Sequence, residues 1–239
     1  MLKKTNVIIS ILGLLVLSTT AYAGWYYAVA DSGGTCADST CDGFLICQNF
    51  EGTGYDNGET PTENVGDGTI DPDYTTDPGR GSQSIELTGS ASYSSIYWTI
   101  STGGTVDIHF MVKIPDTTPT GTTTIYTDSG NYSVQLLSNG NIRLYHGSAY
   151  TSTVSPPFTD DTWAHVWIHL EVSTGADDGV YQLYVAPDRY KPETPIISGS
   201  NGNRTGNPAG VMLRGYLASA GIYFDQVLVS TSVIGDVCE

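Results

Sequence analysis

The residues best suited to recognising a ligand recur at every second position of one short segment. They are His165, Trp167, His169 and Glu171. In a β-strand alternate side chains lie on one face, so these four form a row with neighbours roughly 6.5–7 Å apart. An exposed Trp can stack on a sugar ring, and His and Glu side chains can hydrogen-bond to the sugar hydroxyls. The row therefore indicates a carbohydrate-binding surface on the face of a sheet.

A second segment offers polar side chains in the same way. Residues 105–114 alternate strictly, with apolar side chains on one face and Asp107 and His109 on the other. If the two segments lie in one sheet, their polar residues line the same face, and tyrosines near strand ends extend the platform. The candidate sugar contacts are His109, Tyr145, His165, Trp167, His169 and Glu171. The alternative is that a loop covers Trp167 and leaves the histidines bonded to backbone or solvent.

Alternation of this kind dominates the chain after residue 83 and predicts β-strands throughout. Asn139-Gly140 between two alternating segments is a strong hairpin signal. Residues 52–83 and 187–208, rich in Gly, Pro and Asn or Asp, predict long loops, the first with room for one short strand. Strands are predicted at 44–47, 96–100, 105–114, 132–136, 141–145, 164–172, 180–185 and 222–229.

Composition agrees with an all-β fold. Hydrophobic residues make up 39% of the chain and charged residues 14%, which is too apolar for a disordered protein. The 28 Gly and 16 Tyr, with few Lys, Glu or Arg, argue against a helical bundle. Two inward-facing apolar rows, on 105–114 and 164–172, predict a two-sheet antiparallel β-sandwich of the jelly-roll type. We expect one domain, residues 44–239, after an irregular lead-in at 24–43.

The chain is strongly acidic. Its 25 Asp and Glu outnumber its 9 Lys and Arg, which makes the net charge −16. Such a surface repels phosphate backbones and anionic lipids, so nucleic acid and anionic membranes are poor partners.

The first 23 residues have the pattern of a secretory signal. Two lysines precede the apolar segment 7–17, and Ala21-Tyr22-Ala23 supplies the small residues that a signal peptidase reads, with cleavage expected before Gly24. The apolar segment is short for a membrane span, and no later segment approaches that length. We therefore expect a secreted protein, extracellular or at the cell surface; the alternative is a retained N-terminal anchor.

The four cysteines predict disulfides, because an even number in an exported chain is typical of them. They are Cys36, Cys41, Cys47 and Cys238, and this spacing fits no common zinc site. Of the three possible pairings we favour Cys36–Cys41 as a local clip and Cys47–Cys238 as a clamp. The clamp requires the first and last strands to be neighbours.

Four stretches give the sequence a family resemblance. They are Phe50-Glu51-Gly52, residues 80–87 (RGSQSIEL), residues 162–169 (TWAHVWIH) and residues 222–229 (IYFDQVLV). In order and spacing they resemble the concanavalin A-like lectin/glucanase superfamily, in particular its laminin G-like jelly-roll domains. The resemblance spans residues 44–235 and implies that Trp163 is a core residue. It implies no single activity, because this fold hosts lectins, adhesion modules, hydrolases and lyases.

The resemblance also implies a calcium site. Many relatives hold the ion between an acidic residue after the first strand, a backbone carbonyl and an Asp of the last strand. The matching positions are Glu51 and Asp225. Oxygen ligands suit this hard cation, and we expect a structural role for it. The alternative is a surface carboxylate and a structural turn.

The catalytic motifs of the superfamily are absent. Its laminarinase-type hydrolases carry E-x-D-x-x-E or E-x-D-x-E on one strand, which supplies the acid and the nucleophile. Here Glu171 lies in a predicted strand and Glu86 in the strand that the resemblance implies at 80–87. They are the only Glu residues in such strands, and neither has a carboxylate two residues away. The Arg-rich, Gln-[Ile/Val]-His and Tyr-x-Lys-x-Gly-x-Tyr strands of jelly-roll alginate lyases are also missing.

Three functions follow as hypotheses. The first is a non-catalytic carbohydrate-binding or adhesion module. We prefer it because the chain has the row of aromatic and His residues but lacks the catalytic pairs of carboxylates. The second is a structural surface or filament-layer protein, which predicts self-association. The third is a polysaccharide lyase or hydrolase with an atypical site, where His109, His165 or His169 is the base and a Tyr the acid.

Overall fold

The computed structural model describes residues 43–237 apart from short gaps. The gaps are residues 56–57, 103, 129–131, 147–149, 152, 156, 172–178 and 202–208. The expected signal sequence and the lead-in up to residue 42 lie outside the described residues. Among those that are described, no helix has the length and apolar character needed to cross a membrane.

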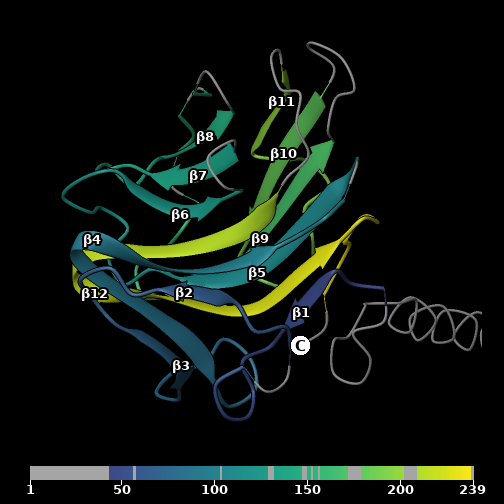
Figure 1. The fold of residues 1–239 in the computed structure, drawn as a ribbon. Helices are drawn as coiled ribbons and strands as arrows, with labels where there is room; N and C mark the ends of the chain where they lie inside the picture. The colour runs from purple at the N-terminus through teal and green to yellow at the C-terminus, as the bar shows by residue number, and fades with distance from the viewer. Residues whose placement is uncertain are drawn as a thin grey trace, which may run out of the picture.

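Twelve β-strands form the described part of the chain, and it contains no helix (Figure 1). All the strand pairs are antiparallel. The strands are β1 (Ile46–Gln48), β2 (Thr62–Asn64), β3 (Ile70–Tyr74), β4 (Ser84–Thr99), β5 (Val106–Lys113), β6 (Thr123–Thr127), β7 (Tyr132–Leu136), β8 (Ile142–His146), β9 (Trp163–Glu171), β10 (Gly179–Ala186), β11 (Ile197–Asn201) and β12 (Gly210–Ser230).

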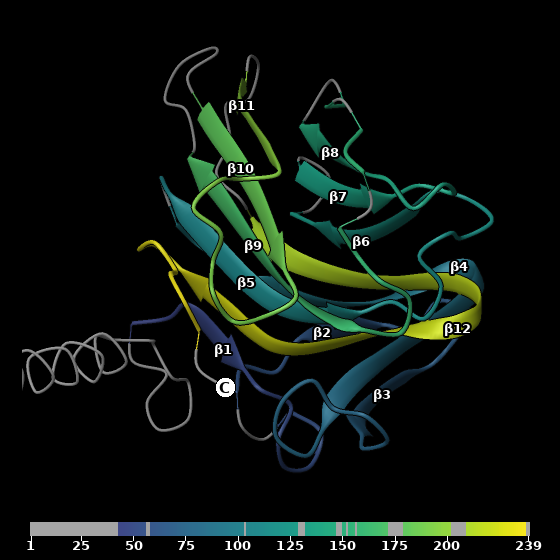
Figure 2. The ribbon, with the colours of Figure 1, turned by 180° about the vertical axis from the view of Figure 1, so that it is seen from behind.

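The strands form one hydrogen-bonded sheet that folds back on itself into two packed layers (Figures 1 and 2). This happens because β4 and β12 are long enough to run through both layers. Residues 223–230 of β12 pair with β5, which is followed by β9, β10 and β11 in the larger layer. Residues 210–215 pair with β4 and lie beside β6, β7 and β8 in the smaller layer. The predicted two-sheet antiparallel sandwich is confirmed.

Some strands are longer than the sequence predicted, and others were not predicted at all. Alternation indicated only residues 222–229 of β12, because the pattern breaks at register shifts between Gly215 and Ile222, where the strand passes from one layer to the other. Strand β11 lies inside the predicted loop 187–208, and β2 and β3 both lie inside the predicted loop 52–83. The Thr-rich β6 was not predicted either.

The core lies between the two layers, where the predicted inward rows meet. Val106, Ile108, Phe110 and Val112 of β5 are fully buried, as are Val166, Ile168 and Leu170 of β9. The ring of Phe110 lies 6.3 Å from that of Tyr126 in the smaller layer and 5.9 Å from that of Phe224 on β12. One aromatic side chain therefore joins three strands across the sandwich.

The predicted hairpin is present between β7 and β8. Leu136 pairs with Ile142, and the Leu137 N–H donates to the Asn141 carbonyl, which closes the turn. Gly140 has a φ of 78°, a left-handed conformation that glycine adopts without steric cost.

The first and last strands are neighbours, as the predicted clamp requires. Cys47 of β1 pairs with Leu228 of β12 and is buried, at 2% exposure. There is no free cysteine among the described residues. Cys36, Cys41 and Cys238 lie outside them, so the disulfide pairing remains a prediction.

Replacing Phe110 by Ala should test the aromatic link across the layers. We expect the free energy of unfolding to fall by about 3–5 kcal/mol, because the change opens a cavity among packed rings. Chemical denaturation measures it. Val65→Ala, at a 47% exposed position, is the control and should change the stability by less than about 0.5 kcal/mol. Equal losses in both variants would contradict this account of the core.

Candidate functional site

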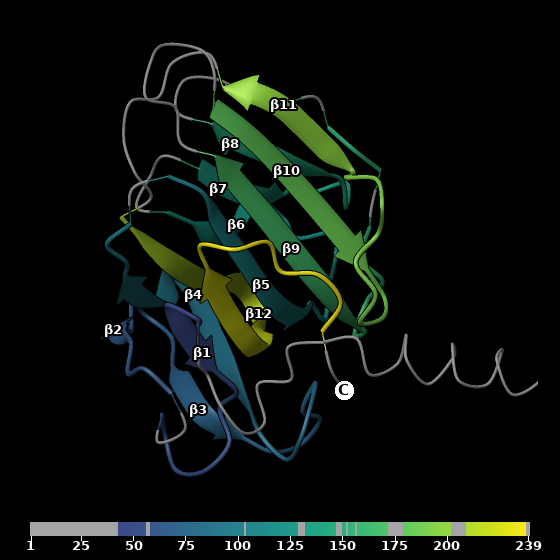
Figure 3. The same ribbon diagram turned by 90° about the vertical axis from the view of Figure 1, so that its right-hand side faces the viewer.

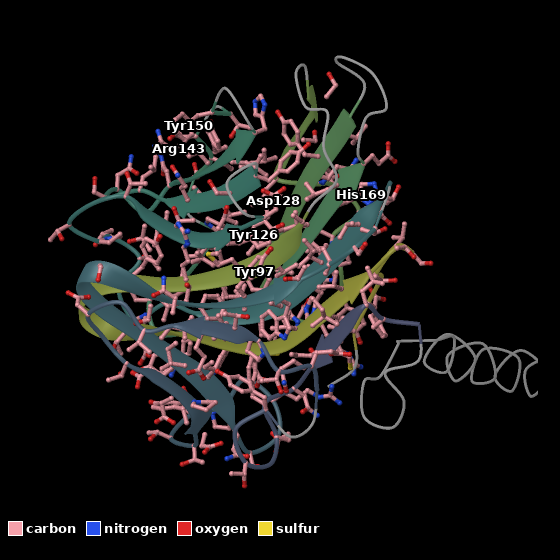
Figure 4. All side chains as sticks on the ribbon, in the orientation of Figure 1. Tyr97, Tyr126, Asp128, Arg143, Tyr150 and His169 are labelled. Atoms are coloured by element: carbon pink, nitrogen blue, oxygen red, sulfur yellow. The ribbon has the colours of Figure 1, made fainter. Side chains whose placement is uncertain are left out.

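The outer face of the larger layer brings the two predicted polar rows together. In the β5–β9 pair, Asp107 is opposite His169 and His109 is opposite Trp167. Tyr145 does not join them, because it lies on β8 in the smaller layer, where its ring contacts that of Tyr150 at 5.0 Å. Figure 4 shows Tyr150 over β8, well separated from His169. The prediction of one shared platform is therefore wrong for Tyr145.

Trp167 is not available for stacking on a sugar. It is 1% exposed, its indole N–H donates to the Gly235 carbonyl at 3.0 Å, and it packs with Ile234 and Val237. Figure 3 shows the segment after β12 crossing the outer face of β5 and β9. The expectation of an exposed Trp167 is therefore wrong, because the C-terminal segment covers this side chain. This agrees with the alternative given above, in which a loop covers Trp167.

The C-terminal segment, residues 231–237, is held by the loop that follows β10. The Lys191 ammonium donates to the Ile234 carbonyl at 3.1 Å, and the backbone N–H of Lys191 donates to the Asp236 carboxylate at 2.9 Å. The Val237 N–H donates to the Arg189 carbonyl at 3.0 Å. These bonds hold residues 231–237 over the outer face of the larger layer.

Two of the histidines form a buried pair beneath this segment. His109 is fully buried and His165 is 8% exposed, with Nε2 of the first 3.1 Å from Nδ1 of the second. Burial, with the charge of His165 when protonated, holds the pKa of His109 well below its ordinary value. His109 is therefore neutral in the folded protein at neutral pH.

The third histidine has the opposite environment. His169 Nδ1 lies 2.7 Å from Asp107 Oδ2, and its Nε2 lies 3.3 Å from Glu171. The hydrogen bond to Asp107, against a smaller effect of burial, raises the pKa of His169. His169 thus bridges Asp107 and Glu171, which is a different arrangement from the separate sugar contacts that we expected.

An open pocket lies beside the covered row. Its volume is about 460 Å³, and Met111, Trp163 and His165 from β5 and β9 form its floor. Residues 79–81 form one wall and residues 187–189 the other. Of the predicted sugar contacts, only His165 lines it.

Trp163 is the aromatic ring of this pocket. It alternates with the inward Ala164 and lies on the outer face, partly buried, so its implied place in the core is wrong. Its indole N–H donates to the Asp77 carbonyl at 3.2 Å. A Cβ on Gly79 would lie 3.0 Å from the ring, so glycine lets the wall pass this close.

A buried lysine holds the same wall in place. The Lys113 ammonium lies 2.8 Å from Asp77, 3.6 Å from Asp161 and 4.5 Å from the centroid of the Tyr223 ring. Burial opposes its charge, but the hydrogen bond to Asp77 and the nearby charges of Asp77 and Asp161 together outweigh burial and raise the pKa of Lys113. This cation stays charged and attaches the loop before β4 to the sheet.

Glu51 and Asp225, the implied calcium ligands, both contact the loop of residues 80–83. Glu51 accepts hydrogen bonds from the backbone N–H and hydroxyl of Ser82, both at 2.6 Å, and Asp225 accepts one from the Arg80 N–H at 2.7 Å. Burial raises the pKa of Asp225 to about 8, and Glu51 adds to the rise. Two carboxylates therefore bind one loop, one of them costly to ionise, and among the described residues no third His, Cys, Asp or Glu side chain joins them as a metal ligand.

Sequence reasoning missed the walls of the pocket. Arg80, Asp188 and Arg189 lie in loops without periodicity, far apart in the chain, and only the tertiary fold brings them together. The available signal was compositional, because arginine is rare in this acidic chain.

The two histidine environments predict opposite responses to acid. His109 has a pKa lowered by folding, so below about pH 6.5 the unfolded state binds the extra proton and stability falls as the pH falls. His109→Gln should reduce that loss, by up to about 1.4 kcal/mol per pH unit. Urea denaturation at neutral and acidic pH measures the difference.

His169→Gln is the matched comparison for this test. The pKa of His169 is raised by folding, so it stabilises the protein in acid and loses that effect as the pH rises through its folded pKa. The variant should therefore lose more stability on acidification than the wild type. The same response in both variants would contradict the assignment.

Comparison with known proteins gives a likeness in fold only. No family model and no curated protein matches the sequence. Among solved structures, the cellulose induced protein Cip1 has a TM-score of 0.59 and 17% identity, over 81% of this chain and 100% of that one. A botulinum neurotoxin type C structure has a TM-score of 0.52 and 10% identity, and a mutant Trypanosoma rangeli sialidase 0.51 and 11%, each over 80% of this chain.

The chain spans all of the first protein but only 48% of the neurotoxin chain and 31% of the sialidase chain. At these identities the matches carry no residue roles from those proteins to this one. Together with the strand order, they show that the chain has a two-sheet antiparallel β-sandwich fold of the jelly-roll type.

Proposed function

We propose that the protein is a secreted, non-catalytic carbohydrate-binding module of the laminin G-like type, which binds a glycan or polysaccharide at the pocket around Trp163. The observation that carries this proposal is a partly exposed indole in a pocket whose rim is polar. Its volume of about 460 Å³ is within the usual range for small-ligand pockets. We further propose an extracellular or cell-surface location, which rests on the signal sequence.

The chemistry of the lining suits a sugar. The Trp163 ring supplies an apolar face for the C–H groups of a pyranose, while Arg80, Asp188 and Arg189 offer donors and acceptors for hydroxyls. His165 adds an imidazole at the floor. Cell entry of the botulinum neurotoxin type C, which has a similar fold, depends on interaction with two ganglioside molecules, and this supports a sugar partner.

A glycan array probed with residues 24–239 tests this proposal. We expect selective binding that Trp163→Ala weakens by about 10- to 100-fold, because truncation of a central aromatic contact has effects of this size. Trp163→Phe separates loss of the ring from loss of the fold, and thermal denaturation checks that each variant folds. Tyr150→Ala, at a 49% exposed ring on the other layer, is the control and should bind normally.

Three outcomes would contradict the proposal. A blank array with concentration-dependent assembly would favour the structural hypothesis. Release of new polysaccharide products over time, abolished in His165→Ala, would favour a lyase or hydrolase. Undiminished binding in both Trp163 variants would place the sugar elsewhere.

We also propose that calcium binds between Glu51 and Asp225 and stabilises the loop of residues 80–83. A bound ion would offset the cost of the buried Asp225 carboxylate. It would also fix one wall of the pocket, because Arg80 and Gly81 belong to this loop.

Thermal denaturation in calcium and in chelator tests the metal site. Calcium should raise the melting temperature of the wild type, with about 2.7 kcal/mol of stabilisation at a hundredfold excess over Kd. Asp225→Asn and Glu51→Gln should lose this response, whereas Glu193→Gln, at an exposed position, should keep it. A wild type indifferent to calcium would exclude the site.

A further inference from the structure

Four of the six basic residues in the described part of the chain lie at or beside the pocket, although the protein has a net charge of −16. Six Lys and Arg residues lie in the described part: Arg80, Lys113, Arg143, Arg189, Lys191 and Arg214. Arg80 and Arg189 line the pocket, and Lys113 and Lys191 hold its two walls. Only Arg143 and Arg214 belong to the smaller layer.

The two lysines are engaged in holding the structure. Lys113 is bonded to Asp77 and Asp161, as described above. Lys191 donates to the Ile234 carbonyl and lies 3.7 Å from Asp107. Their charges are balanced by local carboxylates, so they position the walls.

The two arginines are the cations of the lining itself. They come from opposite walls, and Asp188 is the one carboxylate among the lining residues. The charge of Arg80 also favours the ionised forms of Glu51 and Asp225, although for Asp225 the larger effect of burial still raises the pKa. Arg189 donates to the Tyr190 hydroxyl at 3.1 Å, and its guanidinium lies 5.1 Å from the centroid of the Tyr190 ring.

Both arginines have their backbones anchored. The Arg80 N–H donates to the buried Asp225 carboxylate, and the Arg189 carbonyl accepts from Val237. A guanidinium on a fixed backbone loses less entropy on binding and presents a planar fork of donors that matches a carboxylate or sulfate. The surrounding acidic surface makes such a local positive site more selective, because it repels anions that do not fit.

We propose that the pocket selects a glycan that carries an anionic group, with Arg189 and Arg80 binding the anion and Trp163 stacking on the sugar ring. This inference rests on the proposed carbohydrate-binding function and names its ligand class. The anion is a uronate carboxylate or a sulfate ester, which share the recognition chemistry.

Matched polysaccharides test the inference on the full mature chain. One arm compares a polyuronate with its carboxyl-reduced form, and the other compares a sulfated galactan with its desulfated form. We expect the anionic member of one pair to bind about 10- to 100-fold more tightly, the usual effect of one charge-assisted pairing. The arm in which this occurs identifies the anion.

Three variants assign the effect to the pocket. Arg189→Gln should abolish the preference for the anionic polymer, and Arg189→Lys should restore it in part, because the charge returns without the fork. Arg143→Gln, on the smaller layer, is the matched control and should keep the full preference.

The inference and the proposed function fail in different ways. Binding through Trp163 that is equal for both members of each pair, or tighter for the neutral member, would overturn the anionic preference and leave the carbohydrate-binding function intact. A preference retained in Arg189→Gln would also overturn it. Absence of binding to every glycan tested would reject the proposed function, and the inference with it.

Discussion

Strand β12 is the element on which the rest of the structure depends. It pairs with β1, β4, β5 and β6, more partners than any other strand in the described part. Because it passes through both layers, it joins them into one sheet, and its residues Ile222, Phe224 and Val227 are fully buried in the core between them. Long-range pairing of this kind makes the two layers cooperative, since neither can form its hydrogen bonds without the same strand.

The continuation of β12 decides which part of the outer face remains open. Residues 231–237 turn back across β5 and β9 and bury Trp167 with Ile234 and Val237 in a small second core. Covering an indole and satisfying its N–H in this way stabilises the protein, but it removes the ring from any ligand. The open part lies beyond the segment, where Trp163 and His165 face the loops of residues 79–81 and 187–189.

Alternation in the sequence predicted the faces of the strands well and their surroundings poorly. The rows on 105–114 and on the described residues 164–170 face inward as predicted, and Asp107, His109, Trp167 and His169 do meet on one outer face. A row of outward-facing residues has the same sequence pattern whether water or a peptide segment covers it. Residues 231–237 show no hydrophobic periodicity from which we could predict that they cover the row. The presence of Arg80 and Arg189 in one pocket could not be predicted for another reason. They belong to two irregular loops that only the tertiary fold places on opposite sides of the pocket.

Strand β12 and the segment that follows it fix the two walls of that pocket. Asp225 of β12 accepts the Arg80 N–H, and Val237, in the segment after β12, donates to the Arg189 carbonyl. The two arginines of an acidic chain are thus attached to one continuous stretch of chain, and a guanidinium gains selectivity when its distance from a partner cannot adjust. A shift in the path of β12 would move both walls at once, so the stability of the sandwich and the geometry of its pocket are physically linked.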